Sequence, residues 1–165
     1  LKQAAKTMNF LTEHGISNYG ELESKLTALS TRRDTAHAEI KRIESRSAEL
    51  ALVMKHAGTY RQLKPLYERY RKSNDKEKFL RGHESEIILF EAAARELKRL
   101  GTVPLPTTES MKTELAKLNT EKERLLTEYK TARTEAQEYD TVKQNVDALL
   151  TVAKEQEQQR RHELE

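Results

Sequence analysis

Residues 60–81 combine positive charge with aromatic rings. Residues 55–99 hold twelve basic and seven acidic residues, a local charge of +5, against +3 for the whole chain. Cationic side chains neutralise phosphates and release counterions, and aromatic faces can stack on unpaired bases. The candidates for DNA contact are Arg61, Lys64, Arg69, Arg71, Lys72, Lys76, Lys78 and Arg81, with Tyr60, Tyr67, Tyr70 and Phe79 among them.

A structural explanation of the same segment stays open. The three tyrosines follow the apolar spacing of a helix, so they can belong to a core instead of a binding surface. The cations can equally form a solvated face. The charge pattern alone therefore leaves DNA contact and a structural role as alternatives.

Residues that could support enzymatic chemistry do not cluster. The five histidines, His14, His37, His56, His83 and His162, never form a pair at metal-ligand spacing. The chain has no cysteine for thiolate ligands, and its five glycines do not form a phosphate-binding loop. We expect no metal, no cofactor, no small-molecule substrate and no catalysis.

Composition and periodicity together predict an elongated all-α protein. Of the 165 residues, 35% are charged and 36% are hydrophobic, which is too polar for a compact globule but too periodic for disorder. The longest apolar run, Ile87 to Phe90, cannot span a bilayer. We expect a single cytoplasmic domain over residues 1–165, and the initial Leu1 suggests a piece of a longer protein.

Two apolar stripes with alternating spacings of four and three residues predict the scaffold that positions these side chains. The first comprises Leu22, Leu26, Leu29, Arg33, Ala36, Ile40, Ile43, Ser47, Leu50, Met54 and Ala57. The second comprises Met111, Leu115, Leu118, Lys122, Leu125, Tyr129, Ala132, Ala136, Tyr139, Lys143, Val146, Leu150 and Ala153. Such stripes are typical of coiled-coil helices. We predict that they pair as an antiparallel hairpin within one chain, and the alternative is a parallel dimer.

Caps and helix breakers predict the remaining boundaries. A short helix over 1–15, with Leu1 on its stripe, ends at Gly15, and Asn18 with Glu21 caps the first coiled-coil helix over 17–58. Residues 59–101 form a basic helical middle region, kinked near Pro65 and interrupted before a helix that Asn74 caps and Gly101 ends. After Pro104 and Pro106, Thr107 or Thr108 caps the second coiled-coil helix over 107–155, and residues 156–165 fray. The apolar middle region should form a small helical bundle at one end of the hairpin.

Three cationic residues occupy positions in the predicted stripes: Arg33, Lys122 and Lys143. Polar residues at such positions usually fix the register of paired helices at some cost in stability. Their long side chains can also reach water while their stems stay buried. We predict a role in register, and binding of a partner is the alternative.

Three segments resemble a known family: TYRQLKPLYERY, FLRGHESEIILFEAAARELKRLG and VPLPTTESMKTEL. They are similar to the region that follows the catalytic domain in relaxases, the mobilisation nucleases of conjugative and mobilisable elements from Gram-positive gut bacteria. The similarity extends from Leu1 to about Leu150. It implies a parent protein that nicks one DNA strand at an origin of transfer and stays attached to it through a tyrosine.

The resemblance transfers no catalytic residue to this chain. In that family a histidine cluster holds the metal and a tyrosine acts in the amino-terminal nuclease domain, and no closely spaced histidine pair is present here. The resemblance implies a non-catalytic helical module that supports DNA transfer by binding DNA or proteins of the transfer complex. The alternative is a structural coiled-coil spacer or dimerisation element without nucleic-acid contact.

Overall fold

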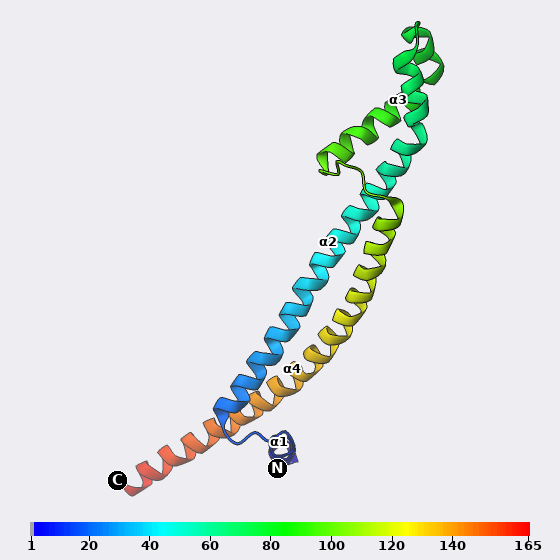
Figure 1. Cartoon of the computed structure of the whole chain (residues 1–165). Coiled ribbons are helices and arrows are strands. Elements are labelled where there is room, and N and C mark those ends of the chain that lie inside the picture. Colours follow the sequence, from blue (N-terminus) through cyan, green and yellow to red (C-terminus); the bar gives the residue numbers. More distant parts are fainter. Residues whose placement is uncertain (1) are drawn as a thin grey trace. The chain divides into compact units, whose positions relative to one another are not determined.

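The computed structural model describes residues 2–165, and that range contains four helices and no β-strand (Figure 1). They are α1 (Lys2–Glu13), α2 (Tyr19–Lys72), α3 (Lys76–Arg99) and α4 (Thr108–Leu164). The long helices α2 and α4 pack against each other. The predicted all-α fold is confirmed; Leu1, which we placed on the first apolar stripe, lies outside the described residues.

Cross-helix contacts establish that α2 and α4 are antiparallel. The hydroxyl of Tyr19 donates to Asp147, Arg32 lies 3.6 Å from Glu128, and Arg46 lies 2.8 Å from Glu114. The partner number on α4 falls as the residue number on α2 rises. The predicted antiparallel pairing within one chain is therefore correct.

The chain divides into two compact units. Unit 1 comprises the residues up to Ile40 together with Glu123–Glu165, and unit 2 comprises Lys41–Lys122. Both α2 and α4 pass through each unit, α1 belongs to unit 1, and α3 belongs to unit 2. The single domain predicted over residues 1–165 stays a prediction.

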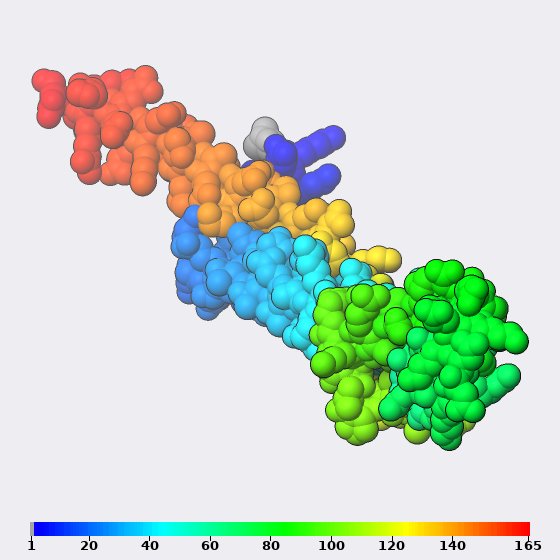
Figure 2. Space-filling model, turned by 90° about the horizontal axis from the view of Figure 1, so that it is seen from above, coloured from blue at the N-terminus to red at the C-terminus, as the bar shows by residue number. Residues whose placement is uncertain are grey.

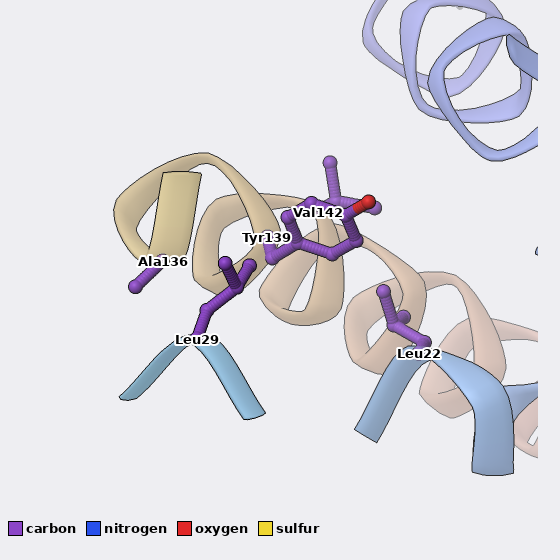
Figure 3. Close-up of a cluster of buried hydrophobic side chains, with 5 residues drawn as sticks. All are labelled: Leu22, Leu29, Ala136, Tyr139 and Val142. Carbon is purple, nitrogen blue, oxygen red and sulfur yellow. The ribbon is translucent and has the colours of Figure 1, made fainter. Parts of the chain in front are cut away.

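The core of unit 1 lies between α2 and α4 (Figure 3). Leu22 and Leu29 from α2 pack with Ala136, Tyr139 and Val142 from α4. Phe10, Leu11 and Ile16 cover this cluster from the side of α1. Burial of a leucine or valine of this kind contributes roughly 1.5–3 kcal/mol, so this apolar contact is the main attraction between the helices here.

The core of unit 2 draws on three helices. Leu50, Val53 and Ala57 from α2 meet Leu97 from α3 and Met111 from α4. The middle region therefore forms a small helical bundle, as predicted. However, Ile88 and Leu89 on α3 remain more than half exposed, so this apolar helix is covered on fewer sides than its composition led us to expect.

The first apolar stripe is buried or half-buried at every position, whereas the second ends at Val146. Leu150 is 49% exposed and Ala153 is also exposed. The reason is that α2 begins at Tyr19, whose hydroxyl bonds to Asp147 on α4. The part of α4 that follows Asp147 therefore has no residues of α2 opposite it. The predicted stripe was too long at this end.

Helix ends follow most of the predicted caps. Gly15 and Gly101 adopt the left-handed conformation, with φ of 65° and 69°, just after α1 and α3. The Asn18 side chain accepts a bond from the backbone N–H of Glu21 at 2.9 Å, and Thr107 accepts one from Ser110 at 3.1 Å. Both caps are confirmed.

The cap of α3 is Asp75 and not Asn74. Its carboxylate accepts the backbone N–H of Lys78 at 3.1 Å, so the helix begins one residue later than the predicted cap implies. Within α3, His83 leaves the helical region with φ of −138° and ψ of 26°. Gly82, a poor helix former, adjoins this break.

Two expected interruptions of helices are not observed. We predicted separate helices over 17–58 and 59–72, but α2 continues through Gly58 and Pro65 to Lys72. An interior proline removes one backbone hydrogen bond, a local loss that packing of the helix against its neighbours can offset. The tail over 156–165, which we expected to fray, is helical to Leu164, and Glu157 and Arg161 pair one turn apart at 3.0 Å.

Membrane insertion was not expected from the sequence. Over residues 2–165, none of the helices combines the length and the apolar composition that crossing a bilayer requires.

Candidate nucleic-acid interface

All eight candidate cations lie in unit 2 and are exposed. Arg61, Lys64, Arg69, Arg71 and Lys72 lie on the last turns of α2. Lys76, Lys78 and Arg81 lie on the first turns of α3, before the break at His83. The turn over residues 73–75 connects the two groups, so the fold brings the cations of both helices to the same end of this helix pair (Figure 1).

The cations and the tyrosines occupy adjoining sectors of α2. At about 100° per residue, the five cations from Arg61 to Lys72 fall within an arc of roughly 160°, over a rise of about 17 Å. Tyr60, Tyr67 and Tyr70 fall outside this arc, with Tyr60 and Tyr67 within about 40° of Arg71. Glu68 lies within the cationic arc and is its one acidic member.

The aromatic residues pack on one another between α2 and α3. Phe90 stacks on Tyr60 at 4.9 Å and on Tyr67 at 4.3 Å between ring centroids. Tyr67 lies 5.8 Å from Tyr70, and Tyr70 lies 6.0 Å from Phe79. This series of rings, which we call the ring ladder, fixes α3 against the last turns of α2.

Two of the candidate cations cover members of the ring ladder. The ammonium of Lys64 lies 5.9 Å from the centroid of Tyr60, and the guanidinium of Arg69 lies 5.7 Å from that of Phe79. Cation–π contacts at exposed sites contribute about 0.5–1 kcal/mol. Lys64 and Arg69 therefore support the packing and remain exposed to solvent.

Arg61 has a structural task that its neighbours lack. Its guanidinium donates to the hydroxyl of Thr108 at 2.8 Å and to the carbonyl of Pro106. These bonds attach the non-helical segment before α4 to α2. Arg61 is therefore engaged within unit 2, and seven of the eight predicted cations remain as the basic surface: Lys64, Arg69, Arg71, Lys72, Lys76, Lys78 and Arg81.

An open groove of about 500 Å³ runs between α2 and α3 beside the ring ladder. Lys64 and Arg71 line it from α2, and Arg95 lines it from α3, together with Glu68 and Glu91. Arg95 was not among the predicted site residues because only the packing of α3 on α2 brings it to the same groove as Arg71.

The two predicted register residues of α4 both contact α2. Lys122 lies 3.3 Å from Glu44. Lys143 lies 3.5 Å from Asp147 on its own helix, and its ammonium is 5.8 Å from the ring of Tyr19 at the start of α2. Interaction with Tyr19, and then with Asp147, raises the pKa of Lys143. The hydrogen bond that the Tyr19 hydroxyl donates to Asp147 raises the pKa of Tyr19.

Arg33 differs from these two lysines. Its guanidinium bonds to Asp34 at 3.0 Å on the same helix, and this bond raises the pKa of Arg33. Its half-buried side chain therefore makes its ion pair within α2. A role of Arg33, Lys122 and Lys143 in register stays a prediction.

The sequence did not reveal Arg46 as a cross-helix residue. Its guanidinium makes two bonds to the carboxylate of Glu114, at 2.8 Å and 3.2 Å, and this pairing raises the pKa of Arg46. Arg46 lies beside the first stripe and not on it. Only the register of α2 against α4 identifies Glu114 as its partner.

The described part of the chain holds no group of three or more acidic or histidine side chains arranged to bind a metal ion. His14, His37 and His83 each lie against an aromatic ring, at 4.0, 5.7 and 4.6 Å between centroids. Comparison with known proteins finds no matching family model, no matching curated protein and no matching solved structure.

Proposed function

We propose that this chain is a non-catalytic helical module that binds DNA through the basic surface of unit 2. The observation that carries the proposal is that the cations are exposed, while the aromatic residues beside them are partly or fully buried and pack on one another. Exposed cations at the ends of two connected helices can contact phosphates without rearrangement. In line with the resemblance to the region after the relaxase nuclease domain, the module would support DNA transfer.

Charge reversal tests the assignment of the surface. Arg71, Lys72, Lys76 and Lys78 are exposed and lie outside the bonds that hold Arg61 and the contacts that hold Lys64 and Arg69. Changing all four to Glu should weaken binding to a 20-base-pair duplex at least ten-fold. It should also reduce the slope of log K against log salt by about 3 to 4, because each lost phosphate contact removes about 0.9.

The matched control carries the same change of charge in unit 1. Lys6, Lys25, Lys130 and Arg133 are exposed there, and changing them to Glu again replaces three lysines and one arginine. The control should keep most of the affinity, measured by fluorescence anisotropy at several salt concentrations. Equal loss in both variants would mean that net charge, and not the basic surface, governs binding.

The relaxase context has its own test. If the module belongs to a relaxase, the gene should encode, ahead of Leu1, a nuclease domain with a histidine cluster and a catalytic tyrosine. Sequencing the native gene upstream of this segment provides the measurement. An unrelated upstream domain would remove the transfer context and leave the DNA-binding proposal to the charge-reversal experiment.

Self-association is a second candidate, and the end of α4 favours it. Leu149, Leu150 and Val152 are 44%, 49% and 49% exposed, and the last turns of α4 stand clear of α2 in the space-filling view (Figure 2). The occupant we propose is α4 of a second copy, running antiparallel. The segment after Val152 carries three basic and four acidic residues, so little net charge opposes a second copy: Lys154, Glu155, Glu157, Arg160, Arg161, Glu163 and Glu165.

Sedimentation velocity tests this second candidate. The wild-type chain should form dimers at about 100 µM, and the change Leu150→Asp should leave it monomeric. Leu126→Asp is the matched control, because Leu126 is also exposed on α4 but lies where α2 is opposite. A wild-type chain that remains monomeric at this concentration would exclude self-association as the function.

A further inference from the structure

We infer that the ligand of the basic surface is double-stranded DNA, held through its phosphates, and that the ring ladder stacks on no base. This inference rests on the proposed function and names its substrate class. From the sequence, aromatic residues among cations suggested stacking on unpaired bases equally well. The packing of the rings decides between these two kinds of ligand.

Each ring of the ladder already contacts at least one other ring. Phe90 lies between Tyr60 and Tyr67 and is only 6% exposed. Tyr67 and Tyr70 lie against each other, and Tyr70 lies against Phe79. A base that stacked on Phe90 would have to displace Tyr60 or Tyr67, and that would weaken the packing of α3 on α2.

The two ends of the ladder are covered as well. Lys64 covers Tyr60, while Arg69 and His83 lie against Phe79 at the other end. Proteins that bind single strands without sequence preference usually present open aromatic platforms in a positively charged groove. The groove between α2 and α3 has cations, but it also contains Glu68 and Glu91, and its rings are paired.

Phosphate density then favours the duplex. Double-stranded DNA carries one charge per 1.7 Å of axis, against one per 3.4 Å of each strand. A duplex as long as the cationic face of α2, about 17 Å, therefore carries roughly ten phosphate charges, against about five on one of its strands. A flexible single strand also loses conformational entropy on a helical surface, and stacking would not compensate for that loss.

The first experiment compares a 20-base-pair duplex, one of its strands, and an abasic strand that keeps the phosphates but lacks the bases. Anisotropy at 50–200 mM salt gives the dissociation constants. We expect the wild-type chain to bind the duplex at least ten-fold more tightly than either strand. The ordinary and abasic strands should bind within two-fold of each other, because the bases contribute nothing.

The second experiment removes one ring at a time. Tyr60→Leu and Tyr67→Leu should lower the melting temperature, because each removes a stacking contact with Phe90, and they should leave duplex affinity within two-fold. If either variant does not fold, the comparison of the ordinary and abasic strands with the wild-type chain still tests whether bases contribute to binding. A variant that folds but loses single-strand binding selectively would contradict the inference.

The outcomes separate this inference from the proposal on which it rests. If the abasic strand binds more weakly than the ordinary strand, bases contribute to binding, and if the single strand binds at least as tightly as the duplex, the duplex is not the preferred ligand. The inference is then wrong while DNA binding stands. If neither duplex nor single strand binds, DNA binding itself is excluded.

Discussion

Single side chains form polar pairs between α2 and α4. Arg46 with Glu114, Lys122 with Glu44, and Tyr19 with Asp147 each join the two helices at a fixed level. An apolar stripe of similar residues is nearly indifferent to a shift of one heptad. Polar pairs would lose their partners on such a shift, so we predict that they help to fix the register.

The pair Arg46 and Glu114 should be coupled but modestly stabilising. Both side chains are about 40% exposed, so we expect a coupling free energy of about 0.5–1 kcal/mol from a double-mutant cycle with Arg46→Ala and Glu114→Ala. The coupling should decrease in 1 M salt. Chemical denaturation gives the four unfolding free energies. Additive effects of the two changes would mean that the pair does not contribute.

The hydrogen bond of Tyr19 should make stability depend on alkaline pH. Because folding raises the pKa of Tyr19 above its ordinary value of 10.0, the contribution is complete below pH 10 and is lost as the pH rises through the folded-state pKa. The raised pKa of Lys143 acts in the same direction. Wild type should exceed Tyr19→Phe in stability at pH 8, and the difference should shrink by pH 11.5 in urea titrations.

A difference that is constant over this range would show that the hydrogen bond does not carry the effect of Tyr19. Tyr139, whose pKa burial also raises, is present in both proteins and cancels in the comparison.

Among the helices, α2 and α4 illustrate how tertiary packing overrides local signals. Gly58 and Pro65 indicated a break, yet α2 runs through both. The apolar stripe of α4 indicated continued packing as far as Ala153, yet it is covered only to Val146. In each case the deciding factor is which helix lies opposite, and a local pattern does not contain that information.

Substitution of glycine should have opposite effects inside a helix, at Gly58, and at a left-handed helix end, at Gly101. A Cβ at Gly58 would have nothing within 4 Å, so Gly58→Ala should stabilise the chain by about 0.5–1 kcal/mol through a less flexible unfolded state. Gly101 has φ of 69°, so Gly101→Ala should destabilise it by about 1–2 kcal/mol. Urea denaturation measures both changes. A loss of stability in Gly58→Ala would indicate that α2 is interrupted there.

Two leucines of the same predicted stripe on α4 should respond differently to truncation. Leu125 is 6% exposed, so Leu125→Ala should cost about 2–5 kcal/mol. Leu150 is 49% exposed, so Leu150→Ala should cost less than about 1 kcal/mol in the monomer. Thermal or chemical denaturation at low protein concentration compares them. If both substitutions lowered the free energy of unfolding by a similar amount, Leu150 would have to be packed against another helix in the monomer.

At the level of the whole molecule, the distribution of charge matters more than its total. The chain carries +3, while residues 55–99 carry +5 and residues 107–165 carry −3. A DNA-binding surface on such a chain acts through local charge, because the Debye length is about 8 Å at physiological salt. The acidic part therefore weakens long-range attraction but leaves direct phosphate contacts intact.

Wild-type binding to duplex DNA should depend steeply on salt. Seven phosphate contacts would give a slope of log K against log salt of about −6, and the four cations without structural contacts alone would give about −4. We therefore expect a slope between about −4 and −6 in anisotropy titrations from 50 to 200 mM salt. A slope near zero would contradict phosphate binding, whatever the affinity.

Periodicity predicted two long helices with matching apolar stripes and an apolar helical middle region, and it favoured antiparallel pairing within one chain while a parallel dimer remained the alternative. Those features depend on one-dimensional patterns: the spacing of Leu22 and its successors, and the caps at Asn18 and Thr107. The exposure of the cations could also be predicted from the sequence, because charged residues on an amphipathic helix point away from the apolar stripe.

The tertiary structure alone decided the partners. It paired Arg46 with Glu114, placed Arg95 in the same groove as Arg71, and assigned Arg61 to the segment before α4. It also placed the tyrosines in a ring ladder with Phe90. A sequence specifies which face of a helix is apolar, charged or aromatic. Which other face meets it depends on register and on the neighbouring helix, and those are fixed only when the whole chain packs.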